Sequence, residues 1–407
     1  MGIVNDALRG LHDLPLWYKA SARQRDPRLW TFGTWDGQRY SDNSRALYEY
    51  VLSNCPDIRA VWMTRSQQVY DLLSAKQMPV ALCDSEEGRS VQQRSGYFFL
   101  TKGPNDSDPR LMRGCHLVWL WHGMPLKQIG RDAMAFQRRN SLWKRCKTLI
   151  RRIIVPWEFL GGETLSTAPY FTPHLQSAFG LPESEVWEVG YPRNDYFFRA
   201  DITEQLITDL HQRYFRTTAE GKTQPVRLML YMPTHRDAAT RSGKAFDPFS
   251  MAGFDLAQLE AVLEQQNILL LYKGHFFDSQ NEGLKNSKRI LTITDNDYDN
   301  LYTFIKDVDI LLTDYSSVYF DFLLCQKPIL LFPFDLEEYV ANSRPFYFDY
   351  EMMEGRKVYS WSELCESLAK ADYGVPSQTT IDLMHTYQDG NTCERVVDRV
   401  RSLNPKL

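Results

Sequence analysis

Short apolar runs recur along the first half of the chain, and a more polar stretch separates each from the next. The runs rich in β-branched and aromatic residues are Arg59–Thr64, Gln77–Leu82, Gly96–Leu100 and His116–Leu120. Runs of this length are typical of buried parallel strands. Helical character marks stretches such as Asn43–Leu52, where Asp42 can serve as the N-cap. The pattern predicts alternating strands and helices.

The second half of the chain repeats this alternation. The expected strands are Arg227–Tyr231, Ile268–Tyr272, Ile290–Ile293, Ile310–Thr313 and Pro328–Phe332, and the expected helices are Asp255–Gln265, Leu301–Ile305 and Val318–Cys325. Strands that alternate with helices predict parallel sheets covered on both faces. We expect two Rossmann-like domains, residues 1–195 and 196–407, with ligands beyond the carboxyl ends of the strands and an active site in the interdomain cleft.

Composition narrows the class of protein further. The 407 residues include 47 Lys and Arg against 51 Asp and Glu, a net charge of -4, and 43% are hydrophobic. This apolar content excludes general disorder. Neither an apolar run of about 18 residues nor a secretory signal occurs, so we expect no transmembrane helix and no leader. Seven cysteines without C-x-x-C spacing indicate reduced thiols, with neither a disulfide framework nor a zinc site.

One segment of the first domain combines cations with aromatic and aliphatic residues. From Arg138 to Arg152 it holds seven basic residues and no acidic one, and apolar residues recur at helical spacing through Trp157. Such a basic helix, near residues 138–157, favours an anionic membrane surface. The alternatives are an ordinary surface helix and a nucleic-acid contact, which the net charge disfavours. The expected membrane-binding residues are Arg138, Arg139, Trp143, Lys144, Arg145, Lys147, Arg151, Arg152 and Trp157.

Candidate chemistry in the first domain follows the predicted strand His116–Leu120. There His122 precedes Gly123 directly. An imidazole can accept a proton near neutral pH, and a glycine lets a substrate approach the backbone closely. The alternative for a lone histidine is a buried ring that is hydrogen-bonded to a carbonyl group. His122 is therefore a candidate general base.

Candidate chemistry in the second domain also follows strands. The residues in those loops are Thr234, Arg236, Lys273, His275, Ser316, Ser317, Asp335 and Glu337. Cations and hydroxyl groups beside a helix start suit a diphosphate, although the serines could simply cap the helix, and the acidic residues could hold ribose hydroxyls or be solvated. The chain lacks a G-x-G-x-x-G fingerprint after a strand and a Walker loop, which disfavours dinucleotide redox and P-loop chemistry. Together these residues predict a diphosphate-binding domain that works with a general base.

Several blocks of sequence carry a family resemblance that runs from about residue 30 to about residue 400. They are Tyr40–Leu47, Trp121–Lys127, Gly190–Asp195, Met232–Arg236, Tyr272–His275, Asp307–Ser317 and Tyr387–Gly390. Their residues, order and spacing resemble the CDP-glycerol glycerophosphotransferase family, which builds teichoic acids and related poly(alditol phosphate) capsules. Met124 and Phe276 depart from the family pattern, which often has Thr and Pro there.

The resemblance implies a GT-B fold, with an N-terminal acceptor domain and a C-terminal donor-nucleotide domain. It implies transfer of glycerol phosphate, or ribitol phosphate in relatives, from the CDP-alditol to a hydroxyl group, with release of CMP. The two histidines of the family motifs fall on His122 and His275. The implied donor-binding residues are Gly123, Arg193, Thr234, Arg236, Lys273, Asp314, Ser316, Ser317, Asp335 and Glu337.

The expected partners follow from the same resemblance. They are CDP-glycerol or CDP-ribitol, a lipid-linked or oligomeric polyol-phosphate or glycan acceptor, and an anionic membrane, with no nucleic acid. We expect a cytoplasmic protein on the inner face of a bacterial membrane, with no required cofactor and no metal site, although dependence on Mg²⁺ stays open. Asp307 and Asp309 precede a strand and are interpreted as structural. Two alternatives are a GT-B glycosyltransferase or epimerase that uses a nucleotide sugar, and a catalytically silent membrane scaffold.

Overall fold

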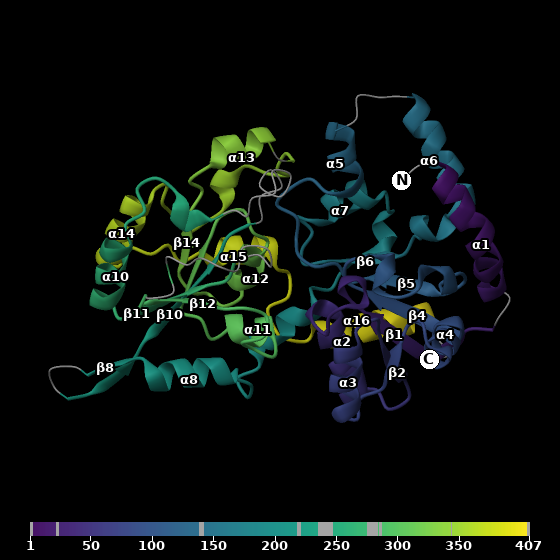
Figure 1. Cartoon of the computed structure of the whole chain (residues 1–407), viewed down its shortest axis with the longest axis horizontal. Coiled ribbons are helices and arrows are strands. Elements are labelled where there is room, and N and C mark those ends of the chain that lie inside the picture. Colours follow the sequence, from purple (N-terminus) through teal and green to yellow (C-terminus); the bar gives the residue numbers. More distant parts are fainter. Residues whose placement is uncertain are drawn as a thin grey trace. The chain divides into compact units, whose positions relative to one another are not determined.

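The computed structural model describes residues 3–21, 24–137, 142–217, 221–234, 247–274, 284, 287–342 and 344–404. The chain divides into two compact units (Figure 1). Unit 1 consists of Met1–His122, Gly130–Asp195 and Thr386–Leu407, and unit 2 consists of Gly123–Ile129 and Tyr196–His385. The expected division into residues 1–195 and 196–407 therefore differs from these units. The chain passes briefly to unit 2 after His122, and its C-terminal segment returns to unit 1.

A parallel seven-stranded sheet forms the centre of unit 1, in the order β3-β2-β1-β4-β5-β6-β7. Its strands are β1 (Asp26–Gly33), β2 (Arg59–Thr64), β3 (Val80–Leu82), β4 (Ser95–Leu100), β5 (His116–Trp119), β6 (Glu163–Ser166) and β7 (Val186–Glu188). Every residue of β4 is buried, as expected for a strand covered on both faces. Gly33 pairs with Leu100 and Leu100 pairs with Trp119, so the segments that follow these three strands meet at one edge of the sheet.

Eight α-helices of the described chain belong to unit 1. They are α1 (Ile3–Ser21), α2 (Asp42–Asn54), α3 (Gln67–Ala75), α4 (Glu86–Arg94), α5 (Gly130–Gln137), α6 (Leu142–Ile154), α7 (Thr172–Phe179) and α16 (Thr392–Leu403). Ser66 and Ser85 cap α3 and α4 through their hydroxyl groups. The N-cap of α2 is Ser41 rather than the expected Asp42, whose carboxylate is held elsewhere. No described helix has the length and apolar character needed to cross a bilayer.

The C-terminal helix α16 belongs to unit 1 because of its apolar face and its cap. Val396, Val397 and Val400 are buried, and α16 packs against α2. The carboxylate of Asp195 accepts hydrogen bonds from the backbone N–H groups of Thr392, at 2.9 Å, and Cys393, at 2.8 Å. A carboxylate in this position stabilises the positive end of a helix. Burial and capping therefore join the last segment to the first unit.

A parallel six-stranded sheet forms the centre of unit 2, in the order β12-β11-β10-β13-β14-β15. Its strands are β10 (Arg227–Met232), β11 (Ile268–Tyr272), β12 (Ile290–Thr292), β13 (Ile310–Thr313), β14 (Ile329–Leu331) and β15 (Arg356–Lys357), and β8 (Phe215–Thr217) with β9 (Thr223–Pro225) forms a separate antiparallel pair. Helices in this unit are α8 (Gln205–Arg213), α10 (Leu256–Gln265), α11 (Leu301–Ile305), α12 (Val318–Leu323), α13 (Leu336–Asn342), α14 (Trp361–Ala369) and α15 (Gln378–Met384). The strands expected in this half of the sequence are confirmed.

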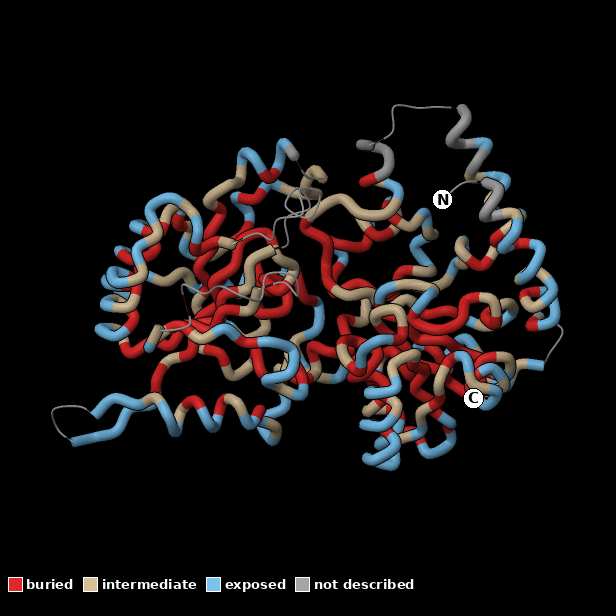
Figure 2. The backbone as a smooth tube through the Cα atoms, viewed as in Figure 1, coloured by how far each residue is buried: buried red, intermediate tan, exposed pale blue. Residues whose placement is uncertain are grey.

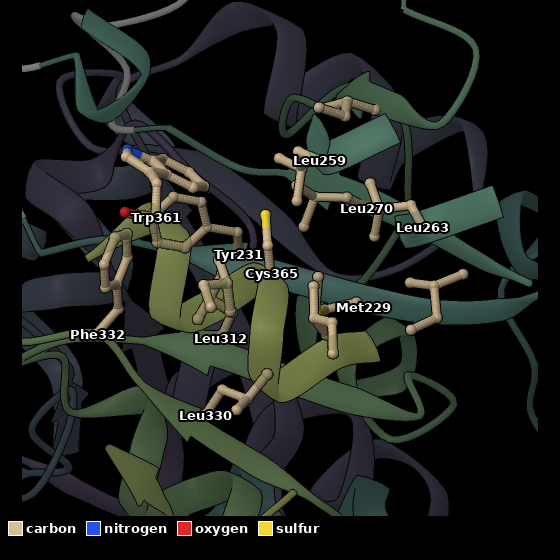
Figure 3. Packing of buried hydrophobic residues seen from close by; sticks show 14 of the residues in the cluster. Met229, Tyr231, Leu259, Leu263, Leu270, Leu312, Leu330, Phe332, Trp361 and Cys365 are labelled. Atoms are coloured by element: carbon tan, nitrogen blue, oxygen red, sulfur yellow. The ribbon is translucent and has the colours of Figure 1, made fainter. Parts of the chain in front are cut away.

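The core of unit 2 lies between its sheet and the helices α10 and α14. Met229, Leu270, Leu312 and Leu330 project from four neighbouring strands toward side chains of those two helices, including Trp361 (Figure 3). All of these residues are at most 2% exposed. Each contributes on the order of 1.5–3 kcal/mol by burial. Burial is concentrated in the sheets of both units, while α8 and the β8–β9 pair are largely exposed (Figure 2).

Candidate active site

His122 lies beyond the carboxyl end of β5 in unit 1, near two indole rings. Its ring centroid lies 4.2 Å from that of Trp121 and 5.7 Å from that of Trp35. The Nδ1 atom lies 3.4 Å from the carbonyl oxygen of Thr101. A carbonyl oxygen can only accept, so this contact favours the tautomer with the proton on Nδ1 and leaves Nε2 as the acceptor.

Burial sets the protonation state of His122. It lowers the pKa of the imidazole below 6.5, because the charged form loses hydration. The carboxylate of Asp42 and the Thr101 carbonyl oppose this shift, while Arg193 and Lys102 add to it. The imidazole is therefore neutral at pH 7 and can accept a proton through Nε2.

Arg193, which is predicted to bind the donor, lies in a buried ion pair. One guanidinium nitrogen lies 2.6 Å from Oδ1 of Asp42, and the two side chains are 1% and 7% exposed. Both residues belong to unit 1. This guanidinium therefore lies in a buried ion pair. The charge of Asp42 also acts on the pKa of His122, in the direction that raises it. Gly123, the first residue assigned to unit 2 after His122, has a φ of 146°, which a side chain would strain.

Asp314 anchors the carboxyl edge of the sheet in unit 2. Its side chain is fully buried, and Oδ1 accepts hydrogen bonds from the backbone N–H groups of Thr234, at 2.8 Å, and Tyr315, at 2.5 Å. The hydroxyl group of Tyr350 donates to its carbonyl oxygen at 2.9 Å. Asp314 therefore fixes the loop after β10 to the loop after β13, which supports the site rather than exposing a carboxylate.

The other candidates of unit 2 gather at the same edge of the sheet. Lys273 Nζ lies 2.8 Å from Oδ1 of Asp295. Ser316 Oγ accepts a long hydrogen bond of 3.4 Å from the backbone of Val318, and Ser317 makes no side-chain cap bond to α12. Capping of α12 therefore gives these two hydroxyl groups little to do, with one long hydrogen bond from Ser316 and no side-chain cap bond from Ser317. Asp335 accepts a hydrogen bond from the hydroxyl group of Tyr315 at 2.9 Å, while Glu337 is exposed in the first turn of α13.

Two expected site residues, Arg236 and His275, lie outside the described residues. Within the described part of the chain, no group of three or more His, Cys, Asp or Glu side chains has the arrangement of a metal site. The carboxylate of Asp309 accepts a hydrogen bond from the backbone of Leu228 at 2.8 Å, a structural role in line with the interpretation from sequence.

Sequence reasoning missed three residues around His122. Asn43, Trp35 and Thr101 approach it from segments after or near other strands, and each contact depends on tertiary structure. Asn43 lies in one of the blocks that carry the family resemblance, which was the available signal. The left-handed backbone of Trp35 and Asp36, beside Gly37, offered no clear pattern in sequence.

The membrane-binding candidates divide into three groups. Arg138 and Arg139 lie outside the described residues, and the side chains of the next group within α6 are not described: Trp143, Lys144, Arg145 and Lys147. Arg151 pairs with Glu158, and the Arg152 guanidinium carbon lies 5.5 Å from the ring centroid of Phe159. Trp157 is 2% exposed and packs near Trp17, with ring centroids 6.3 Å apart. Contrary to expectation, Trp157 is a core residue that cannot face a membrane in this structure.

Comparison with known proteins decides the family. The model of the family described as CDP-glycerol:poly(glycerophosphate) glycerophosphotransferase matches residues 16–402. The chain belongs to this family. The glycerophosphotransferase family consists of transferases, so the expectation of an enzyme is confirmed and a silent scaffold is disfavoured.

Relatives cover most of this glycerophosphotransferase sequence. A teichoic acid glycerol-phosphate transferase of Staphylococcus aureus is 26% identical over 89% of this chain and 88% of its own length. A teichoic acid poly(glycerol phosphate) polymerase of Bacillus spizizenii is 28% identical over 80% of this chain and 79% of its own length. A teichoic acid ribitol-phosphate primase of the same organism is 30% identical over 61% of each chain.

Solved structures confirm the fold class. A variant of the wall teichoic acid polymerase TagF has a TM-score of 0.72 and 20% identity, and the match covers 98% of this chain and 97% of that one. A UDP-N-acetylglucosamine 2-epimerase from Listeria monocytogenes, described as putative, has a TM-score of 0.51 at 11% identity, over 93% and 97% of the two chains. At these identities the likeness concerns the fold alone. The glycerophosphotransferase has the α/β architecture of the GT-B type expected from its sequence.

Proposed function

We propose that this chain transfers glycerol phosphate from CDP-glycerol to a hydroxyl group of a membrane-linked or oligomeric acceptor. The product belongs to a polymer of the teichoic acid or capsule kind, and CMP is released. The observation that carries the proposal is His122, a neutral imidazole whose Nε2 is left as an acceptor, in a chain of the glycerophosphotransferase family. Its relatives named for teichoic acid synthesis support the polymer class.

In the proposed reaction, Nε2 of His122 takes the proton of the acceptor hydroxyl group. The freed oxygen bonds to the β-phosphorus of CDP-glycerol, which bears the glycerol. The bond from that phosphorus to the bridging oxygen breaks, and CMP leaves with the bridging oxygen. Such transfers depend mainly on positioning the reactants and on stabilising charge. The protein must therefore supply a base and a set of hydrogen-bond donors and cations.

The donor diphosphate is assigned to the carboxyl edge of the sheet in unit 2. Lys273 supplies a cation there, and Thr234, Ser316 and Ser317 supply hydroxyl groups. Backbone N–H groups at a helix start and charge-assisted donors suit phosphate oxygens. His275 and Arg236, outside the described residues, remain proposed members of this set.

Acceptor-dependent release of CMP tests the proposal. Purified protein is incubated with CDP-glycerol, or with CDP-ribitol, with and without a lipid-linked or oligomeric acceptor. We expect His122→Ala to lower the rate by about 10²–10⁴-fold, the usual contribution of general base catalysis. His116→Ala, at the other end of β5, is the matched control and should retain the wild-type rate within about twofold. A His122→Ala rate equal to that of the control would contradict the proposed base.

We also propose that α1 and α6 form a face of unit 1 that docks on an anionic membrane at the cytoplasmic side. The two helices pack closely, since a Cβ atom on Gly10 would lie 2.3 Å from Cγ2 of Ile154. Leu11 and Ile153 are 76% and 75% exposed, and Lys19 and Arg152 are exposed on the same helices. Exposed aliphatic side chains beside cations are typical of helices that lie in a membrane interface.

Vesicle binding tests this docking face. Wild-type protein should sediment with vesicles that contain phosphatidylglycerol, and more weakly with phosphatidylcholine alone. Leu11→Asp combined with Ile153→Asp should abolish most of this binding. Leu72→Asp is the matched control, because Leu72 is 42% exposed on α3 of the same unit. Equal binding of both variants would exclude the face formed by α1 and α6.

A further inference from the structure

The first turn of α2 reaches the segment that leads from β5 to His122. Within that turn Asn43 is fully buried, and its Nδ2 donates to the carbonyl oxygens of Leu120, at 3.1 Å, and Trp121, at 2.9 Å. The Trp121 carbonyl belongs to the peptide group that joins Trp121 to His122. Asn43 therefore holds the last two carbonyl groups before the candidate base.

The orientation of the Asn43 amide is fixed by the chemistry of its partners. Its Oδ1 accepts a hydrogen bond of 3.1 Å from the backbone N–H group of Arg193, while its Nδ2 meets two carbonyl oxygens. A flipped amide would place an acceptor against two acceptors and a donor against a donor. Both N–H groups and the oxygen of Asn43 are thus engaged, and no other residue type of this size supplies that combination.

A strained backbone explains why such a clamp is needed. Trp121 has a φ of 58°, in the left-handed region that bulky residues avoid. A residue in this region persists only where surrounding contacts hold it. Release of the Trp121 carbonyl would let its backbone relax toward ordinary conformations and would turn the His122 ring away from its present position.

The neighbours of Asn43 in the same turn support the same loop. The Ser44 hydroxyl lies 2.7 Å from the hydroxyl of Thr101, whose carbonyl oxygen faces Nδ1 of His122. Oδ1 of Asp42 accepts hydrogen bonds from the Asn43 backbone at 2.9 Å and from the guanidinium of Arg193 at 2.6 Å. Three consecutive residues of α2 thus hold the carbonyl groups just before His122, the residue whose carbonyl faces its Nδ1 atom, and Arg193.

We propose that Asn43 is a positioning residue that presents His122 for proton transfer, with Asp42 and Arg193 bracing it. This inference rests on the proposed function, because the proton transfer is that of the glycerophosphotransferase reaction. It assigns Arg193 to the support of the base in place of donor binding. Asn43 itself acts through the backbone of His122 and touches neither substrate nor the reacting atoms.

Two substitutions remove the clamp in different ways. Asn43→Asp keeps the shape and the acceptor that faces Arg193, but loses both donors. Asn43→Ala removes the amide without adding charge, in case the buried carboxylate prevents folding. Asn54→Asp and Asn54→Ala are the matched controls, since Asn54 ends the same helix, is exposed and donates to the carbonyl of Tyr50 at 2.9 Å. Circular dichroism establishes which variants are folded.

Kinetics and nitrogen NMR of labelled histidines separate positioning from other roles. We expect the folded Asn43 variants to lose at least about tenfold in kcat, with the KM for CDP-glycerol changed by less than about twofold, while the controls match the wild type. The ring signals of His122, assigned by their absence in His122→Ala, should shift in the Asn43 variants and not in the controls.

The outcomes that overturn the inference differ from those that overturn the proposed function. An unchanged kcat, a rise in KM alone, or a lost kcat with unmoved His122 signals would each exclude a positioning role. Failure of the wild type to release CMP would refute the proposed reaction, yet the His122 signals would still show whether Asn43 sets the ring.

Discussion

The carboxyl edges of the two sheets present their chemistry in different ways. At the edge of unit 1, an imidazole whose pKa is lowered by burial follows two carbonyl groups that a fully buried asparagine holds, and a buried ion pair belongs to the same edge. At the edge of unit 2, the described candidates include a lysine that is 14% exposed, with a carboxylate partner that is 44% exposed, and two serine hydroxyl groups beside a short helix. The ion pair at the first edge is buried, while the Lys273–Asp295 pair at the second edge is partly exposed, although Asp314 also gives that edge a buried support.

This difference matches the two tasks in the proposed reaction. A base must be neutral and fixed in direction, which burial and hydrogen bonds achieve. A diphosphate site must exchange its charged ligand, so its cation needs a partner that a phosphate can replace. In this proposal the fixed base belongs to unit 1 and the exchangeable charged ligand to unit 2. Substitutions in one unit can therefore test one task without changing the other.

The largest effect is expected from the buried pair in unit 1. Asp42→Asn removes the charge opposite Arg193 and leaves a buried guanidinium uncompensated, which should destabilise the fold by about 3–5 kcal/mol. Denaturant unfolding measures this loss. Asp57→Asn is the control, because its pair with Arg401 has side chains 39% and 36% exposed. That control should lose at most about 1 kcal/mol. Equal losses of unfolding free energy in the two variants would show that the buried Asp42 pair contributes no more to stability than the exposed Asp57 pair.

The fold was largely predictable, because its signals are local. Arg59–Thr64 and Ile268–Tyr272 are strands with the bounds expected from their apolar runs. The strand β1 was missed because Asp26–Gly33 begins with polar residues and proline, and β6 (Glu163–Ser166) and β7 because each is short and includes a glutamate. The return of residues 386–407 to unit 1 was also missed, since the partner of an apolar helix face is set by tertiary structure.

Candidate site residues could be named from the sequence only where polar or titratable groups follow a strand. His122 could be named because it comes directly after an apolar run. The pairing of Arg193 with Asp42 was missed, since nothing local shows that two residues 151 positions apart meet. Asn43 was left without a role for the same reason, because the carbonyl groups it holds are 77 and 78 positions away.

A second prediction concerns a histidine of unit 2 that differs from His122 in having no assigned chemistry. His385 is 3% exposed, its Nε2 lies 2.7 Å from the carbonyl oxygen of Phe320, and burial lowers its pKa to about 4. Between pH 4 and 6.5 the unfolded chain binds more protons than the folded chain, so stability falls as the pH falls through this range. From 6.5 to about 4 the loss amounts to about 3 kcal/mol.

The difference between wild type and His385→Gln isolates this titration from that of the carboxylates. We expect the variant to be less stable at pH 7, because it leaves the buried site imperfectly filled, but to lose less stability on acidification. Unfolding free energies at several pH values between 7 and 4 provide the measurement. Parallel curves for the two proteins would mean that His385 does not titrate in this range.

The smallest effect is expected at the partly exposed Lys273–Asp295 pair of unit 2, where the proposed diphosphate would compete with Asp295 for the lysine. Their atoms lie 2.8 Å apart, and partial exposure weakens the pair. Asp295→Asn should therefore lower the KM for CDP-glycerol by about two- to fivefold, and Lys273→Gln should raise it, with the kcat of Asp295→Asn nearly unchanged. Asp297→Asn, on the same loop, is the control, because its carboxylate is bound to Thr294. If Asp295→Asn instead raised the KM, the carboxylate would be orienting the lysine for its ligand, and the two edges would be alike in needing a fixed support.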